Sequence, residues 1–177
     1  MLKKLLILIG LFISSRCYSQ ITTEVQKKIK LEIESQIPKL KQRLLKEKVN
    51  EVQSEFTIDT FRIESYLTKY IDLNLTDVGM SDASYAGAKQ YDVLLNKYYK
   101  KLLSVLIGED KKVLVQAQKS WLLYRDNEYK LVETISKDDY SGGGTMQRLT
   151  ESSVYLDFIK SRVINLFDHY VRATQNE

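Results

Sequence analysis

Apolar residues recur at three- and four-residue steps along most of the chain, and this spacing limits the possible folds more than any other feature. Five segments show it, at about 21–52, 59–74, 81–106, 110–135 and 145–172. Such spacing places apolar side chains on one face of a helix. No segment sustains an apolar–polar alternation bounded by turn residues, so a sheet is not expected. The short "FTI" before Asp59 is the one candidate strand. The sequence therefore predicts an all-α protein.

The segment 21–52 has lysines and glutamates between its apolar residues, which is typical of an amphipathic helix. We expect Pro38 to kink or divide this helix, because proline lacks a backbone donor. Its charged face is interpreted as a solvent face, with contact to a membrane or a partner as the alternative. Short connectors between the later helices favour an antiparallel helical bundle of about four helices, with 21–52 as an additional N-terminal helix.

We expect Asp59 to cap the second helix, residues 73–81 to form a connector, and Gly108 to end the third helix. The stripes expected to face the core are Ile63, Leu67, Tyr70 and Ile71; then Ala88, Tyr91, Leu95, Tyr98, Leu102 and Leu106; then Leu114, Ala117, Trp121, Tyr124, Leu131 and Ile135; and finally Leu149, Leu156, Ile159, Val163, Leu166 and Tyr170.

Residues 1–19 have the layout of a secretory signal peptide. Lys3 and Lys4 precede an apolar run from Leu5 to Ile13, and small residues lead to a cut after Ser19. The run is shorter than the ~20 residues of a spanning helix, which disfavours the alternative of an uncleaved anchor. Attachment of a lipid at Cys17 is a further alternative that the neighbouring Arg16 disfavours. We therefore expect an extracytoplasmic protein, periplasmic or secreted, without a stable membrane anchor.

Cleavage would remove the single cysteine and three positive charges, so the 27 basic side chains fall to 24 against 23 acidic ones. The remaining net charge of about +1 gives no reason to expect nucleic acid as a partner. Without cysteine, neither a disulfide nor a thiolate metal site can form, and packing alone must stabilise the fold.

The sequence gives little support for an enzyme. His169 is the single histidine, and no serine stands in a nucleophile-elbow context. The glycine-rich stretch "SGGGT" lacks the lysine and the preceding strand of a P-loop. We expect no catalytic residue, no metal site and no cofactor.

Several polar residues lie at or beside the expected core stripes: Asp92, Asn96, Gln118, Arg125, Glu128 and Arg162. We expect them to pair with one another in one buried network, because an unpaired buried polar group costs ~1–3 kcal/mol. The alternative is that Arg125 and its neighbours line a binding surface.

Three stretches together resemble a known family. They are "YDVLLNKYYKKLL" from Tyr91, "LVQAQKSWLLYRDNEY" from Leu114, and "SGGGT" followed by a terminal helix. Over about residues 80–166 the chain is similar to the N-terminal domain of the LprI-like lysozyme inhibitor family. The residues that carry the similarity are Asp92, Leu95, Asn96, Gln118, Trp121, Arg125, Asp126 and Arg162. The resemblance implies an extracytoplasmic helical domain, with lysozyme inhibition in some members.

The family's cysteines are absent from this chain. The corresponding positions are Ala83, Tyr129 and Tyr155, so the resemblance implies that tyrosine packing replaces the disulfides. We expect a signal peptide at 1–19, an amphipathic helical segment at 20–54 and an LprI-like helical domain at 55–177.

The stretch "DDYSGGGT" has two interpretations. Three consecutive glycines allow a sharp reversal between helices, with Thr145 capping the next helix. The same loop is also a candidate binding element for a cationic protein, with tyrosine as an anchor. Its residues are Asp138, Asp139, Tyr140, Ser141, Gly142, Gly143, Gly144 and Thr145.

Together these features predict an exported helical domain that binds a protein, with lysozyme as the first candidate partner and coverage of its cleft as the mode of inhibition. The alternative is a structural or scaffolding module of the cell envelope whose first helix engages another component.

Overall fold

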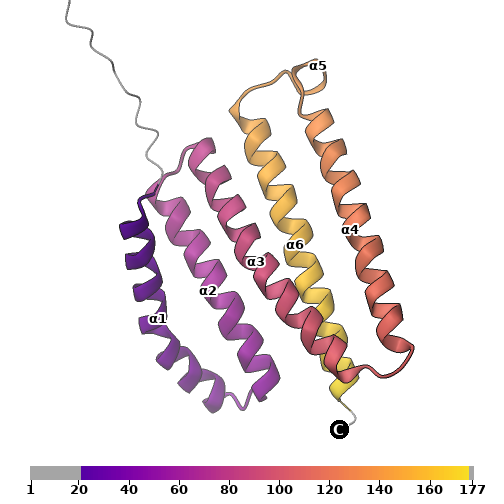
Figure 1. Ribbon diagram of the computed structural model, residues 1–177. Coiled ribbons are helices and arrows are strands. Elements are labelled where there is room, and N and C mark those ends of the chain that lie inside the picture. Colours follow the sequence, from indigo (N-terminus) through magenta and orange to yellow (C-terminus); the bar gives the residue numbers. More distant parts are fainter. Residues whose placement is uncertain (1–20, 176–177) are drawn as a thin grey trace, which may run out of the picture.

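The computed structural model describes residues 21–175, which form six helices and no strand (Figure 1). The helices are α1 (Thr23–Lys46), α2 (Glu51–Leu73), α3 (Asp77–Val105), α4 (Asp110–Ile135), α5 (Asp138–Ser141) and α6 (Thr145–Thr174). The predicted all-α bundle with an additional N-terminal helix is confirmed. The signal peptide expected at 1–19 lies outside the described residues. Over 21–175, no helix combines the length and apolar character needed to cross a membrane.

Side-chain caps start α2 and α3 earlier than expected. Asn50 accepts a hydrogen bond from the backbone N–H of Gln53 at 2.8 Å, and Thr76 accepts one from Gly79 at 3.1 Å. Asp59, expected as a cap, lies inside α2, and the expected connector 73–81 shrinks to residues 74–76. The boundary expected between residues 54 and 55 also falls inside α2.

The helices α3 and α6 pack closely along much of their length. Small residues make this possible, because Ser81, Ala83 and Ala88 of α3 and Ser152 of α6 are all buried. The Ser81 hydroxyl donates to the backbone carbonyl of Arg148 at 3.3 Å. A larger side chain at any of these positions would push the two helices apart.

Aromatic residues fill the space between α2, α3 and α6. The rings of Phe56 and Phe167 stack with their centres 3.8 Å apart, and Tyr98 meets each of them edge-on at 5.3 Å. Ile159, Val163 and Leu166 of α6 lie fully buried in the same cluster. These three helices therefore form the centre of the bundle.

The additional helix α1 packs on α2 and continues through Pro38 without a break, so of the two expected effects of Pro38 the division is wrong. The helix is curved along its length (Figure 1). Its buried residues follow the predicted stripe: Ile29, Ile33, Ile37, Leu40 and Leu44. Arg62 of α2 donates to both carboxylate oxygens of Glu34, at 2.6 and 3.0 Å, which lowers the pKa of Glu34. The helix thus folds back on the bundle.

The expected core stripe of α4 is the largest error of the sequence analysis. Among the described residues of this helix only Leu114 is fully buried, while Tyr124, Leu131 and Ile135 are each more than half exposed. The reason is placement: α4 stands at the edge of the molecule and contacts mainly α6 (Figure 1). Periodicity predicted the helix correctly, but most of the apolar stripe expected in the core is exposed to solvent.

Replacing Tyr98 with phenylalanine should raise the free energy of unfolding by about 1 kcal/mol, because the buried Tyr98 hydroxyl has no hydrogen-bond partner among residues 21–175. The matched control is Tyr91→Phe, since the buried Tyr91 donates to Glu64. That control should lower the free energy by a similar amount. Urea unfolding of both variants measures the two changes, and a Tyr98→Phe variant less stable than the parent would contradict the assignment.

Candidate functional site

Four residues that carry the family resemblance meet between α4 and α6. The guanidinium carbons of Arg125 and Arg162 lie 5.4 and 5.6 Å from the centre of the Trp121 ring, within cation–π range. Arg162 Nε donates to Gln118 Oε1 at 3.0 Å, and burial lowers the pKa of Arg162. We call Gln118, Trp121, Arg125 and Arg162 the Trp121 cluster. It links α4 to α6.

The expected single network is wrong for Asp92, Asn96 and Glu128, and Glu128 forms no hydrogen bond or ion pair with the other members among residues 21–175. Asp92 and Asn96 are exposed on α3 and interact with each other, the amide of Asn96 donating to the Asp92 carbonyl at 2.9 Å. They lie one turn apart beside the buried face of Tyr91 and Leu95 rather than on it, which explains the error. Arg125 donates to its neighbour Asp126 at 2.6 and 2.8 Å.

A groove of about 420 Å³ opens beside the Trp121 cluster. Its aromatic walls are Trp121 and Tyr124 of α4 and Phe158 of α6, and the rings of Tyr124 and Phe158 meet edge-on with centres 5.8 Å apart. Asp157, Ser161 and Asn165 complete its polar side, and Val154 its apolar end. The groove offers an apolar surface with few charges.

Tyrosines pack together where the family has cysteines, as expected. The rings of Tyr129 and Tyr155 lie with centres 5.0 Å apart, and the Tyr85 and Tyr129 hydroxyls are hydrogen-bonded at 2.9 Å. Burial and the bond to Tyr85 raise the pKa of Tyr129. The third position, Ala83, is fully buried in α3. This cluster joins α3, α4 and α6 without a covalent bond.

The loop of the candidate binding element begins with the single turn α5 and ends at three glycines. Gly142, Gly143 and Gly144 have φ values of 75°, 74° and 97°, in the left-handed region that side chains disfavour. A Cβ on Gly143 would also lie 2.4 Å from Asp138 Oδ1. Gly144 is the N-cap of α6 without a side-chain cap, so the expected capping role of Thr145 is wrong.

The base of this loop is fastened to α3, whereas its tip faces solvent. Thr145 Oγ1 donates to Asp77 Oδ2 at 2.6 Å, and Arg148 Nη2 donates to Asp82 Oδ1 at 2.8 Å. Asp139 is exposed, as is Tyr140, at 70%. All eight loop residues are contiguous at one end of the α4–α6 hairpin (Figure 1). The loop and the groove are separate surfaces, because α6 extends roughly 20 Å from Thr145 to Phe158.

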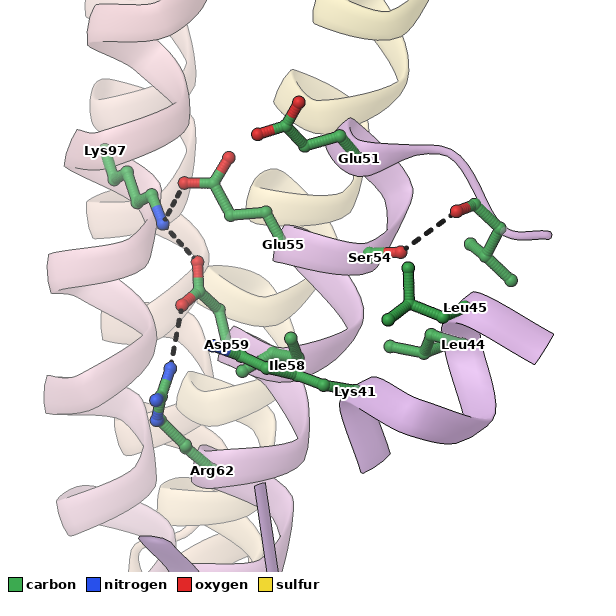
Figure 2. Close-up of a pocket in the computed structure, with 11 residues that line it drawn as sticks. Lys41, Leu44, Leu45, Glu51, Ser54, Glu55, Ile58, Asp59, Arg62 and Lys97 are labelled. Carbon is green, nitrogen blue, oxygen red and sulfur yellow. Dashed lines mark hydrogen bonds and ion pairs between the residues drawn. The ribbon is translucent and has the colours of Figure 1, made fainter. Parts of the chain in front are cut away.

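A larger cavity of about 680 Å³ lies between α1 and α2 (Figure 2). Leu44 and Leu45 of α1 form an apolar side, and α2 and α3 contribute ion pairs. Lys97 contacts both Glu55, at 2.7 Å, and Asp59 (Figure 2). Because both carboxylates are already paired with cations, the cavity presents a neutralised wall rather than a set of free acids or bases.

These ion pairs were not predicted, although the spacing of the charged residues indicates them. Glu55 and Asp59 are four residues apart on α2, and Lys97 and Lys101 are four apart on α3. This spacing brings equal charges to one face of each helix, which favours pairing between the two helices.

Acid should weaken the fold through Glu55. Partial burial raises the pKa of Glu55, but hydrogen bonds from Lys101 and Lys97 outweigh it and hold the pKa below the usual 4.5. The stabilisation is therefore present above about pH 4.5 and is lost as the pH falls through the lowered value. Glu55→Gln should be less stable than the parent at neutral pH, and the two should converge in acid. Urea unfolding across pH tests this, and a constant difference would contradict it.

Replacing Trp121 with alanine should lower the free energy of unfolding by about 2–3 kcal/mol, because the indole is partly buried between two helices. The matched control on the same helix is Leu123→Ala. Leu123 is 65% exposed, so its loss should change stability by less than ~0.5 kcal/mol. Equal effects of the two substitutions would show that α4 is not held by the Trp121 cluster.

The chain was compared with known proteins. A family model described as "Lysozyme inhibitor LprI" matches residues 74–166, from the α2–α3 connector to Leu166 in the second half of α6. The matched part includes the Trp121 cluster, the tyrosine cluster and the glycine loop. Searches of curated proteins and of solved structures each found no match.

Proposed function

Because the chain belongs to the LprI lysozyme inhibitor family, we propose that it binds a lysozyme and blocks the cleft of that enzyme. The observation that carries this proposal is the extent of the match, which covers α3, α4 and α5 completely together with most of α6. We also propose an extracytoplasmic location, which rests on the family and on the signal-like residues 1–19.

Inhibition of this kind requires coverage rather than catalysis. Glycoside hydrolysis depends on two carboxyl groups that flank the scissile bond in a cleft. A rigid protein that occupies the cleft excludes the polysaccharide without any chemistry of its own. We therefore propose no catalytic residue and no cofactor in this chain.

The loop 138–145 is our proposed contact with the enzyme. An exposed tyrosine on a fastened loop is a suitable anchor, because it contributes a large contact area with little loss of conformational freedom. Tyr140 is of this kind, and Asp138 and Asp139 beside it would attract a basic partner. The fastened base means that little ordering is needed on binding.

A scaffolding role in the cell envelope is the alternative function. Residual muramidase activity of several lysozymes, measured with the protein in stoichiometric excess, separates the two. An inhibitor lowers the activity of at least one lysozyme, whereas a scaffold leaves all of them unchanged.

The double substitution Asp138→Lys with Asp139→Lys should weaken inhibition about tenfold, mainly through slower association that depends on salt. Both side chains are exposed, so the melting temperature should stay close to that of the parent. Asp72→Lys on α2 is the matched control, since it changes an exposed acid away from the loop. Stopped-flow association and residual activity measure the effect. If the double variant inhibits as well as the parent, recognition lies elsewhere on the surface.

A further inference from the structure

One face of α4 is exposed along its whole length and carries no charge. Its apolar members are Val113, Ala117, Leu123, Tyr124, Leu131 and Ile135. Successive residues of a helix are rotated by about 100° around its axis, so these six residues fall within a sector of roughly 120°. Four neutral polar residues lie in the same sector: Gln116, Ser120, Asn127 and Thr134. All ten residues are exposed. A helix face that remains in solvent normally carries charges, so this one resembles a contact surface.

This face continues into the groove between α4 and α6. Tyr124 belongs to both, and across the groove α6 contributes Val154, Phe158, Ser161 and Asn165. We call the uncharged face of α4 together with the groove the α4–α6 face. Each chain thus presents a two-helix surface that has apolar side chains but nothing packed against it among residues 21–175.

The two long edges of the α4–α6 face have opposite charge. On the α4 edge lie Lys112, Lys119 and Lys130, which the helical repeat places next to the uncharged residues on the side away from α6. On the α6 edge lie Asp157 and Asp168, and Arg172 follows Asp168 by one turn at the C-terminal end of the same side. All of these side chains are exposed.

We propose that two copies of the chain associate through their α4–α6 faces about a two-fold axis parallel to the helices. Such an axis reverses the face from side to side, so the lysine edge of each copy meets the aspartate edge of the other. An axis across the helices would instead bring lysines against lysines. The charge pattern selects the parallel axis.

The resulting assembly is a four-helix bundle of α4 and α6 from both copies. Each α4 lies beside its own α6 and the partner's α6, and both neighbours run antiparallel to it, as in an up-and-down bundle. Four residues of the predicted core stripe of α4, Ala117, Tyr124, Leu131 and Ile135, would then lie in the core of the dimer. This explains why a helix with seven exposed apolar side chains, six of them on this face, has only Leu114 buried in the single chain.

The heights of the charges agree with this arrangement, because an axis parallel to the helices leaves every residue at its own height. The Tyr129–Tyr155 contact sets Lys130 level with about residue 154, three residues or about 5 Å from Asp157. The Trp121–Arg162 contact sets Lys112 level with about residue 171, close to Asp168 but also to the exposed Arg172, and Lys112 already pairs with Glu109 of its own chain. The pair that supports the arrangement is therefore Lys130 with Asp157, and a lysine side chain can span this offset.

The size of the face fits a dimer of modest affinity. A standard interface involves about 20–30 residues a side, and the α4–α6 face with its edges lies near the lower limit. We therefore expect a dimer that dissociates measurably on dilution. Sedimentation equilibrium of the full chain over a range of concentrations should show monomers and dimers without larger species.

The apolar part is tested by Leu131→Glu, which should raise the dimer dissociation constant at least about tenfold, because it places a charge in the contact. Leu131 is 51% exposed, so the single chain should keep its helical circular dichroism and melting temperature. The matched control is Leu31→Glu on α1, at a leucine that is 73% exposed. That variant should dimerise like the parent.

The orientation is tested by exchanging charges across the edges. Lys130→Glu and Asp157→Lys should each raise the dissociation constant about fivefold, since every change acts twice in a symmetric dimer. The double variant should restore the parental value. Within one chain the two residues form no ion pair with each other among the described contacts, so restoration reports on the partner copy.

Three results would overturn the proposal: a parent that stays monomeric at every concentration, a Leu131→Glu variant that dimerises like the parent, or charge exchange without restoration. A parent protein that is monomeric at every concentration would indicate that the α4–α6 face binds a different protein. The outcome is independent of lysozyme inhibition, because a monomer can still inhibit and a dimer can fail to.

Discussion

The close contact between α3 and α6 is the interaction on which the rest of the structure depends. Small buried residues such as Ala83 and Ser152 let the two helices approach, and this approach brings Phe167 against Phe56 of α2. The three helices then enclose one apolar cluster. The outer helices depend on this centre, since α1 packs on α2 and α4 packs on α6.

Most of the fold could be predicted from the sequence because helical periodicity depends only on local spacing. The stripes of α3 and α6 were assigned correctly, and Tyr91, Tyr98, Ile159 and Leu166 are buried as expected. The start of α2 was missed because Asn50 was not recognised as a cap. The stripe of α4 was misplaced because periodicity shows that a helix has an apolar face but not which neighbour covers it.

In the candidate sites, too, features set by neighbouring residues could be predicted, whereas most contacts between distant residues could not. The reversal at Gly142 to Gly144 follows from the residues alone, because three adjacent glycines tolerate left-handed backbone angles. The hydrogen bond between Gln118 and Arg162 joins two helices and was expected. Asp92 and Asn96 were wrongly placed in the same network, because the spacing of residues gives their position around a helix only to a fraction of a turn. The bond from Thr145 to Asp77 crosses 68 residues of sequence and had no local signal.

The peripheral position of α4 has a consequence for motion within the folded chain. Because α6 reaches the central cluster by itself, α4 behaves as a long helical crossover between α3 and α6. Releasing it would expose the Trp121 cluster and the tyrosine cluster but leave the contact between Phe56 and Phe167 intact. In the single chain we therefore expect local opening of α4 to cost less free energy than global unfolding. Such opening would separate Gln118, Trp121, Arg125 and Asp126 of α4 from Arg162 of α6, and so divide the residues that carry the family resemblance.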